Sequence, residues 1–342
     1  MEQTFYMIKP EAINSSNKIH SKISSQFKII ESLKIALTES DLELLAKYDL
    51  GYLQNPNLFE TFKFFMRQDI VEVGILEKNN VIKEFQQMCG TLPKPSDNPK
   101  SSLRNIYGKP TEKYNGIQFF LNAIHKSQDK TEARHEINLF HQSLLKRTTL
   151  ENCLELAKRV YDYGDKQAHP AYKENLSTIW THHILPVVSY IKQLQTQYNF
   201  NLEETMIAGY FHDVGRIVGD DENHNTIGAD YMADKLSHLE INQNKIDRIY
   251  DIILNHRGSV PTNRKTIESQ ILASADGMAT IQLFPLVFYS SYSKHNLQIL
   301  DGTQKAKHKL EKAWNKLLPK AKPYVEQTYN FLQNNFQLME NK

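Results

Sequence analysis

Histidine and aspartate side chains recur between residues 183 and 276, and their types could bind a metal ion. In chain order they are His183, His212, Asp213, His224, His256 and Asp276. Neutral imidazole and carboxylate are ligands of Zn, Mn, Fe and Mg, and the harder ions favour carboxylate. His212 and Asp213 are adjacent, so they could coordinate together where a helix end loosens, with the aspartate bridging two ions. Gly215, two residues further on, suits such a helix end.

Each of these residues also has an ordinary structural interpretation. A single histidine on an apolar helix face is more often a satisfied core residue than a ligand, and a buried His-Asp pair without metal is common. His182 competes with His183 for the first position. Neighbours on a helix point about 100° apart, so one of the two faces inward. The four-residue spacing to Val187 on the apolar face favours His183.

The second part of the chain must position these side chains on helices. After about Thr148 strand patterns vanish and apolar residues follow helical spacing. Helices are predicted around Trp180–Leu194, from Asn201 to Phe211, over Ile246–Ile253 with His256 at its end, over Ile267–Ala279 and over Lys309–Leu317. The segment 168–175, which contains Pro170, is predicted as a loop. Pro186 is expected to kink the first of these helices.

The first part of the chain has a different pattern, in which short strands alternate with helices. Strands are predicted at Thr4–Ile8, Ile29–Leu37, 70–76 and Ile117–Ile124. Helices are predicted at Ile19–Phe27, from Ser40 to about Tyr48, and at Leu58–Met66, Val81–Met88 and Thr131–Phe140. Ser40 with Glu43 forms a capping-box pattern. The alternation indicates an α+β fold with helices on a small sheet, and we place the domains at residues 1–145 and 146–342.

Composition narrows the class of protein. A chain of 342 residues is long enough for about two domains. The formal charge of +2 argues against a polybasic nucleic-acid-binding protein, and the sequence lacks an apolar run of membrane-spanning length. Two cysteines make no disulfide framework, so we expect a cytoplasmic protein. Neither the glycine-rich dinucleotide motif nor the P-loop motif occurs.

The ordered histidines and aspartates resemble the HD phosphohydrolase superfamily over roughly residues 175–285. The pattern is His, then His-Asp, then a final Asp, with Gly-Arg after Asp213 and the run I-L-A-S-A-D ending at Asp276. The resemblance implies an all-α domain in which four residues hold one divalent ion: His183, His212, Asp213 and Asp276. His224 and His256 match the extra ligands of two-metal members; the alternative is that they contact the ligands or the substrate.

The same resemblance implies metal-dependent hydrolysis of a phosphoester, with one or two ions of Mn, Fe, Mg, Co or Zn and with Asp213 at the reacting centre. Arg216 is our first candidate for a phosphate contact, with Lys235 and Arg257 as alternatives. Pro186 stands where many members have an arginine. Members of the superfamily cleave nucleotides of several kinds, so the substrate stays open.

Two segments of the first part resemble nucleoside diphosphate kinases. They are residues 4–11, which read T-F-Y-M-I-K-P-E, and Asn122–Ser127 followed by Glu136, within a match of about residues 4–141. The resemblance implies a ferredoxin-like domain in which His125 is phosphorylated by a nucleoside triphosphate and passes the phosphoryl group to a diphosphate. Glu136 would orient the ring, with Ser127 in support.

The resemblance also implies a nucleotide site that works with Mg²⁺ bound to the nucleotide. Its residues would be Lys9, Tyr48, Thr91, Arg104 and Asn122. Gln86 replaces a second phosphate-binding arginine, and Leu58 replaces an aromatic residue that stacks on the base. Lys126 and Gln128 replace the usual Gly and Asp beside Ser127. These departures leave open a catalytically inactive domain that senses nucleotide and regulates the hydrolase.

Taken together, the residues predict a two-domain enzyme of nucleotide metabolism or signalling. Nucleotides are the expected small-molecule partners, with neither a membrane nor a nucleic acid expected. A homo-oligomer through the first domain is possible.

Overall fold

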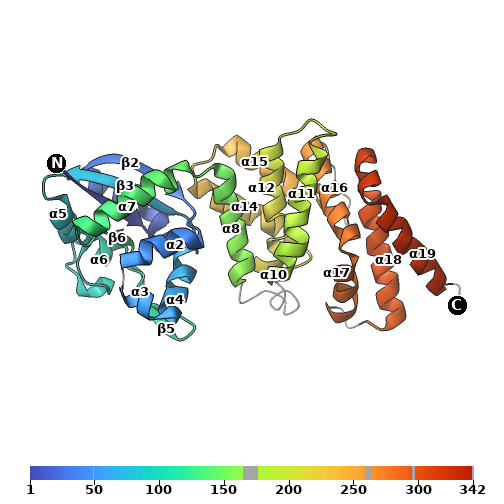
Figure 1. Cartoon of the computed structure of the whole chain (residues 1–342), viewed down its shortest axis with the longest axis horizontal. Helices are drawn as coiled ribbons and strands as arrows, with labels where there is room; N and C mark the ends of the chain where they lie inside the picture. The colour runs from blue at the N-terminus through green and yellow to red at the C-terminus, as the bar shows by residue number, and fades with distance from the viewer. Residues whose placement is uncertain (49, 165–175, 259–263, 295–296, 341–342) are drawn as a thin grey trace. The chain divides into compact units, whose positions relative to one another are not determined.

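A computed structural model describes the chain except for residues 49, 165–175, 259–263, 295–296 and 341–342. The chain forms two compact units (Figure 1): Met1–Leu156 with His238–Glu240, and Ala157–Ser237 with Ile241–Lys342. The division falls inside α8 (Thr149–Tyr163). The domain boundary that we place between residues 145 and 146 stays a prediction. The loop predicted at 168–175 lies outside the described residues.

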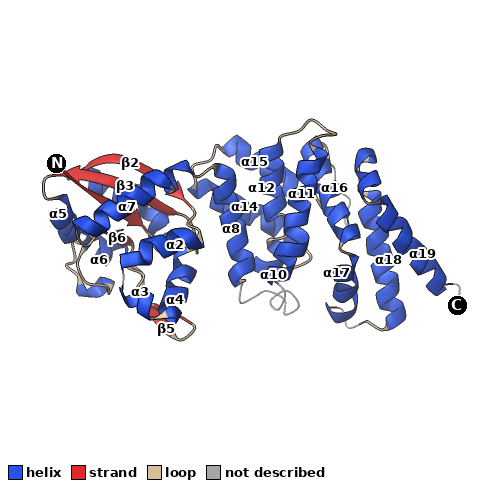
Figure 2. Ribbon diagram, in the orientation of Figure 1, coloured by secondary structure: helices blue, strands red, loops and turns tan. Residues whose placement is uncertain are grey.

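A four-stranded antiparallel sheet forms the centre of the first unit, with strand order β2-β3-β1-β6. The strands are β1 (Glu2–Ile8), β2 (Lys28–Ile35), β3 (Val71–Lys78) and β6 (Ile124–Lys126). Helix α1 (Ser16–Ser24) connects β1 to β2, and α5 (Val81–Cys89) follows β3. This β-α-β-β-α-β order is ferredoxin-like, so the predicted α+β fold is confirmed. Figure 2 shows the sheet in red among its helices.

Both faces of the sheet are covered, because successive strand side chains point to opposite sides. Phe5 and Met7 of β1 belong to a core with α2 (Glu39–Leu45), α4 (Pro56–Met66) and α7 (Lys130–Gln142). Tyr6 and Ile8 belong to a second core with α1 and α5. This unit also contains the short elements α3 (Leu50–Gln54), α6 (Leu103–Tyr107), β4 (Glu112–Tyr114) and β5 (Ile117–Phe119), together with short 3₁₀ helices.

Two local predictions for this unit are wrong. The predicted strand Ile117–Ile124 is two strands: β5 pairs with β4, whereas β6 joins the main sheet. Between them Ala123 has a left-handed φ of 64°, which a continuous strand cannot contain. The helix predicted to start at Ser40 is capped two residues earlier, because Thr38 and Asp41 form the capping box.

Helices are the only regular elements among the described residues of the second unit (Figure 2), which confirms the predicted all-α class. Asn201 caps its helix as predicted, since its side chain accepts a hydrogen bond from the Glu204 amide. The last predicted helix starts earlier than expected, at Ile299. The helices are α10 (Leu176–Ile179), α11 (Leu185–Leu194), α12 (Leu202–Phe211), α13 (Gly215–Val218), α14 (His224–His238), α15 (Gln243–Leu254), α16 (Ile267–Gln282), α17 (Phe284–Tyr289), α18 (Ile299–Asn315) and α19 (Glu326–Glu340).

The helix predicted around Trp180–Leu194 departs from regular α geometry. Residues Trp180–Ile184 form a π-helical turn between α10 and α11. Pro186 follows this turn and has no N–H to donate to the preceding turn of helix, which favours such an irregularity. π turns occur often at functional sites, and this one carries His183.

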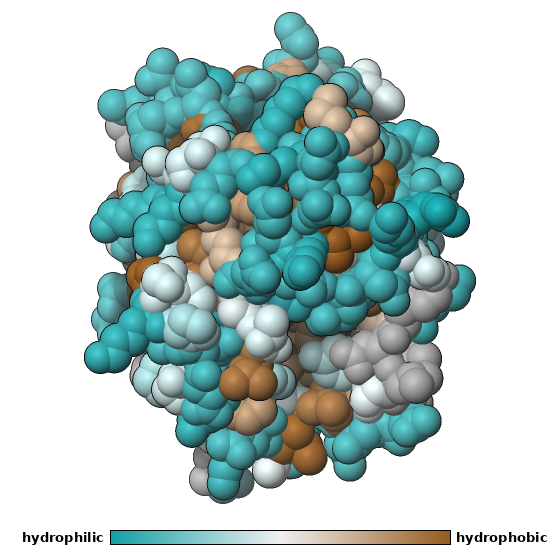
Figure 3. Space-filling view, turned by 90° about the vertical axis from the view of Figure 1, so that its left-hand side faces the viewer, coloured by the Kyte–Doolittle hydropathy of each residue, from teal (hydrophilic) through white to brown (hydrophobic). Residues whose placement is uncertain are grey.

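Among the described helices, no single one is long and apolar enough to cross a membrane. One pair, Ile267–Gln282 with Phe284–Tyr292, meets the criteria of length and composition together, but it is bent by 84°. The face shown in Figure 3 is mostly hydrophilic, with hydrophobic residues gathered only in small separate patches.

Candidate functional site

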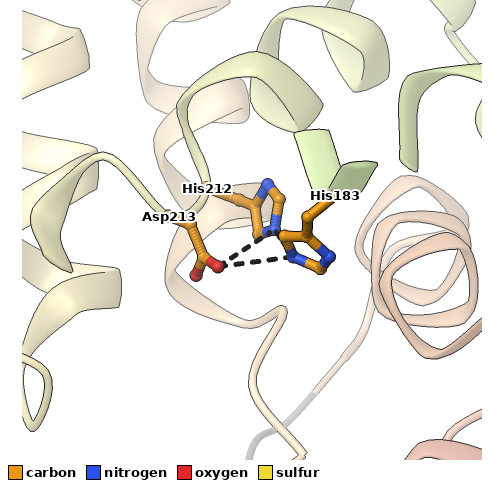
Figure 4. Close-up of side chains that lie close together, drawn as sticks. All are labelled: His183, His212 and Asp213. Atoms are coloured by element: carbon orange, nitrogen blue, oxygen red, sulfur yellow. Dashed lines mark hydrogen bonds and ion pairs between the residues drawn. The ribbon is translucent and has the colours of Figure 1, made fainter. Parts of the chain in front are cut away.

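The predicted metal ligands of the second unit lie together. The π turn supplies His183, and the end of α12 supplies His212 and Asp213, and the three side chains point toward one another (Figure 4). His183 Nε2 lies 3.3 Å from His212 Nε2 and 3.4 Å from Asp213 Oδ2. Asp276 of α16 adds an oxygen 3.5 Å from His183 Nε2. The neighbouring His182 is exposed.

The other carboxylate oxygen of Asp213 faces a second pair of histidines. Its Oδ1 lies 3.5 Å from Nε2 of His224, at the start of α14, and 3.8 Å from Nε2 of His256, just after α15. The two imidazole nitrogens are 3.4 Å apart. Asp213 therefore presents one oxygen to each of two adjacent donor groups, an arrangement that can hold two ions with a bridging carboxylate.

Backbone carbonyl groups orient three of these rings through the other nitrogen. Nδ1 of His212 bonds to the Gly209 oxygen at 2.8 Å, Nδ1 of His224 to the Asp221 oxygen at 2.8 Å, and Nδ1 of His256 to the Ile253 oxygen at 2.6 Å. A carbonyl only accepts, so Nδ1 must carry the proton. Each Nε2 then carries a lone pair for a metal ion.

Electrostatics favour the same protonation states. Burial lowers the pKa of His212, lowers that of His224 to about 4, and lowers that of His256 well below its ordinary value. Burial would raise the pKa of Asp213, but the Arg216 guanidinium beside it holds that pKa well below its usual range. Burial would also raise the pKa of Asp276, but the Lys316 ammonium lowers it, which favours the ionised form. Neutral imidazoles and ionised carboxylates are the forms that bind metal.

Glycines set the approach of the helices that carry the ligands. Gly215 is helical and does not end a helix in a left-handed conformation, so the expectation for it is wrong. A β-carbon there would lie 2.1 Å from the His224 oxygen and 2.7 Å from the Gly228 nitrogen. The absence of a side chain therefore allows α13 to pack on the start of α14, which brings His224 to Asp213.

The donor groups open into a cavity of about 750 Å³, a volume that suits a small-molecule substrate. Arg216 lines it and donates to Asp213 Oδ1 at 2.8 Å, and its guanidinium lies 3.0 Å from His224 Nε2. Arg257 also lines the cavity. Lys235 is not among the described lining residues and pairs with Asp234 at 3.2 Å, so it is a poor candidate for a phosphate contact.

In the first unit, His125 lies on β6 opposite Met7 of β1. Its Nε2 contacts one oxygen of the fully buried Glu136, whose other oxygen accepts a hydrogen bond from Ser127 Oγ at 2.6 Å. Because Glu136 engages Nε2, Nδ1 is the nitrogen that can carry a reactive lone pair. The ring is 24% exposed, so a ligand can reach it.

Lys9, Asn122 and Arg104 lie around the same end of the sheet. Lys9 Nζ donates to Asn122 Oδ1 at 2.8 Å, and burial lowers the pKa of Lys9 to about 8. Arg104 donates to the backbone oxygens of Leu92 at 3.0 Å and Ile124 at 3.3 Å. The guanidinium thus borders His125 through its neighbour Ile124.

The other predicted nucleotide contacts are less closely gathered. Thr91 is exposed on the loop after α5. Tyr48 ends a short 3₁₀ turn, Ala46–Tyr48, and its side chain is outside the described part of the structure. Gln86 donates to the backbone oxygens of Ser127 at 3.0 Å and Gln128 at 2.8 Å. It therefore braces the loop after His125, while Leu58 lies half-buried on α4.

Sequence reasoning missed two kinds of residue at these sites. Glu11 accepts a hydrogen bond from the Ala123 amide at 2.9 Å and so supports the left-handed residue before β6; its place directly after Lys-Pro could have indicated a role. Four lysines of α18 and its C-cap also line the cavity of the second unit: Lys305, Lys309, Lys312 and Lys316. Their spacing of 4, 3 and 4 residues marks one helical face.

Comparison with known proteins identifies both units. Residues 2–144 match the family model described as Nucleoside diphosphate kinase, and residues 180–281 match the one described as HD domain. The chain therefore contains a nucleoside diphosphate kinase domain followed by an HD domain, which confirms both predicted resemblances.

Individual relatives match one part of the chain. The nucleoside diphosphate kinase of Streptococcus agalactiae serotype V is 27% identical over 143 residues, which are 41% of this chain and 98% of that protein. The one from Glaesserella parasuis serovar 5 is 26% identical over 145 residues, 41% of this chain and 94% of that protein.

Solved structures of the same kind are also similar. A C222 crystal form of the Aquifex aeolicus nucleoside diphosphate kinase has 22% identity and a TM-score of 0.35, covering 42% of this chain and 96% of that one. A Borrelia burgdorferi kinase, described as a transition state mimic with bound vanadate and ADP, has 18% identity and a TM-score of 0.38, covering 42% and 88%.

Proposed function

We propose that this chain, which joins a nucleoside diphosphate kinase domain to an HD domain, is a nucleotide-handling enzyme whose HD domain hydrolyses a phosphoester with a divalent metal ion. The donor set carries the proposal: imidazole and carboxylate groups converge beside a cavity that most of them line. This chemistry fits Mn, Fe, Co, Zn or Mg. One ion would be held by His183, His212, Asp213 and Asp276, and a second by Asp213, His224 and His256.

A divalent ion, when bound, would polarise a phosphoryl oxygen and acidify water at the site. The chain supplies the rest. Carbonyl bonds to Nδ1 hold the rings in one orientation, and Asp213 faces both donor groups. Arg216 lines the cavity beside Asp213 and can donate to the oxygens of a phosphoryl group, for which a planar guanidinium is well suited.

The hydrolase proposal is tested by metal analysis and by activity. The purified full-length chain is expected to hold a transition metal and to release phosphate from at least one compound in a nucleotide panel with Mn, Fe, Co or Mg. Asp213→Asn keeps the size of the side chain but loses its charge, and should abolish both. If the wild type binds no transition metal and cleaves no member of the panel, the proposal is wrong.

For the first domain, the proposed reaction is phosphoryl transfer through His125. Nδ1 attacks the γ-phosphorus of a nucleoside triphosphate that carries Mg²⁺, the bond to the bridging oxygen breaks, and the nucleoside diphosphate leaves. A second diphosphate then takes the phosphoryl group from the histidine. The pairing of Nε2 with Glu136 supports this assignment, because it orients the ring and favours its positively charged phosphorylated form.

The alternative, an inactive nucleotide sensor, has its own support. Gln86 is committed to the backbone of Ser127 and Gln128, and Arg104 to backbone oxygens. Incubation with γ-phosphate-labelled nucleotide separates the two. Acid-labile label that disappears in His125→Ala supports transfer, whereas nucleotide binding without label in the wild type supports the sensor.

Nucleotides are the small-molecule partners that this proposal requires. It also includes a homo-oligomer formed through the first domain, which measurement of the molecular mass in solution tests. The proposal places the enzyme in the cytoplasm. The two cysteines of the chain, Cys89 and Cys153, are both buried, and so small a number of cysteines is compatible with a reducing compartment.

A further inference from the structure

One wall of the HD-domain cavity is formed by a helix beyond the residues that match the HD family. The family match ends at residue 281, whereas α18 spans Ile299–Asn315. Lys305, Lys309, Lys312 and the C-cap residue Lys316 all line the cavity. At 1.5 Å of rise per residue, the row extends for about 16 Å. It starts at Lys316, whose ammonium contacts Asp276 of the metal cluster.

The position of this wall is built into α16. A β-carbon at Gly277, next to Asp276, would lie 2.7 Å from the Ala313 oxygen and 3.1 Å from Cε of Lys316. Glycine therefore allows the end of α18 to pack closely on α16. Ser274 of α16 strengthens the contact, because its Oγ accepts a hydrogen bond from the Leu318 amide at 2.9 Å. The lysine row is thus fixed relative to the metal ligands.

Cations outnumber carboxylates among the residues that the structure describes in the lining of the cavity. Among its described lining residues are six cations and three carboxylates; the cations are Arg216, Arg257 and the four lysines, and the carboxylates are Asp213, Asp221 and Asp276. A bound metal ion would add further positive charge. Lys309 is held toward the cavity by a 3.1 Å hydrogen bond to Ser290, another lining residue. Such an excess of positive charge favours an anionic ligand with more than one charge.

Much of the remaining lining is apolar. Ile179, Ala279, Leu283, Leu286 and Val287 contribute to it, with Tyr161 and Tyr289. A ligand that fills the cavity would therefore combine anionic groups with an apolar part. Nucleotides have both properties, since the phosphates and the base occupy opposite ends.

We propose that α18 is a phosphate subsite and that the substrate is a nucleotide with several phosphate groups, one at the Asp213 cluster and the others along Lys309 and Lys312. This inference rests on the proposed function, since it names the substrate class of the same site. A nucleoside monophosphate would place its phosphate at the Asp213 cluster and leave the lysine row without a ligand. A polyphosphorylated nucleotide uses both.

The test measures binding apart from turnover. Inorganic tripolyphosphate and inorganic phosphate are titrated calorimetrically into the full-length chain in the presence of EDTA. The proteins are the wild type, Lys309→Ala, Lys312→Ala and the matched control Lys307→Ala. Lys307 carries the same charge on the same helix but is not among the lining residues. Binding in the first domain contributes equally to all four proteins.

The ratio of tripolyphosphate to phosphate affinity is expected to fall about tenfold in Lys309→Ala and in Lys312→Ala, and to stay unchanged in Lys307→Ala. A ratio that is the same in all four proteins overturns the subsite. The subsite is also overturned if a single-stranded oligonucleotide binds more tightly than tripolyphosphate and this binding is weakened in the two lysine variants. Thermal unfolding of each variant controls for folding.

A kinetic arm separates this inference from the hydrolase proposal. With Mn²⁺, both cavity variants should raise KM for nucleoside triphosphates much more than for monophosphates, with little change in kcat. A chain whose tripolyphosphate affinity depends on Lys309 and Lys312 but which hydrolyses no nucleotide would overturn the hydrolase and leave the subsite standing. Nucleotide hydrolysis that is unchanged in both lysine variants would overturn the subsite and leave the hydrolase proposal standing.

Discussion

The two domains differ in which group bonds to the second ring nitrogen of their candidate functional histidines. In the HD domain, Nδ1 of His212 and of His256 bonds to a backbone oxygen, and both rings are almost fully buried. In the kinase domain, Nε2 of His125 contacts the carboxylate of Glu136, and the ring is partly exposed. A carbonyl fixes the tautomer without adding charge, whereas a carboxylate also stabilises a positive ring. The first arrangement suits a neutral metal ligand and the second a nucleophile that becomes charged.

The largest expected effect comes from the adjacent pair His182 and His183. His183→Ala removes a donor that faces His212 and Asp213, and hydrolysis should fall by at least about a thousandfold, with loss of bound metal. His182→Ala, at an exposed position, should change neither. Metal content and phosphate release measure both variants. Equal losses from the two would show that the helix, and not the ring, matters.

The role of the carboxylate can be examined in the kinase domain without removing the histidine. Glu136→Gln keeps hydrogen-bonding atoms near His125 and Ser127 but removes the charge, so labelling of His125 should slow by about a hundredfold. Ser127→Ala leaves the charge and should cost less. If Glu136→Gln is labelled at the wild-type rate, the charge of Glu136 does not assist His125, and the proposed difference between the two domains is wrong.

Local pattern was enough to predict much of this fold but little of the cavity. Capping by Asn201 and the apolar spacing of the helices are properties of neighbouring residues, and both predictions agree with the structure. The strand over Ile117–Ile124 was wrong because Ala123 adopts a backbone conformation that its apolar character does not reveal. The lysine row was missed because Lys316 meets Asp276 across 40 residues, a contact set by packing at Gly277.

A third prediction concerns the geometry that brings His224 to Asp213. Gly215→Ala places a β-carbon against backbone atoms of His224 and Gly228, which cannot move aside cheaply. We expect a loss of about 1–3 kcal/mol in the free energy of unfolding, together with weaker metal binding. Gly209→Ala is the control, because its β-carbon meets only side-chain ends, such as Ile191 Cδ1 at 2.8 Å. Chemical denaturation distinguishes them, and equal losses would remove the special role of Gly215.

The smallest effect expected is a pH dependence that belongs to the kinase domain. Burial lowers the pKa of Lys9 to about 8, with Arg104 lowering it further and Glu11 opposing the shift. Lys9 is therefore charged at pH 7, and its charge is lost as the pH rises through about 8. If Lys9 contacts the transferred phosphate, labelling of His125 should fall roughly tenfold between pH 7 and pH 9. Lys9→Arg keeps its charge over that range, so a labelling rate that stays level in this variant and declines in the wild type assigns the fall to Lys9. If labelling declines in parallel in the wild type and in Lys9→Arg, the fall belongs to another group. The charge of Lys9 would then not contribute measurably to the reaction at His125.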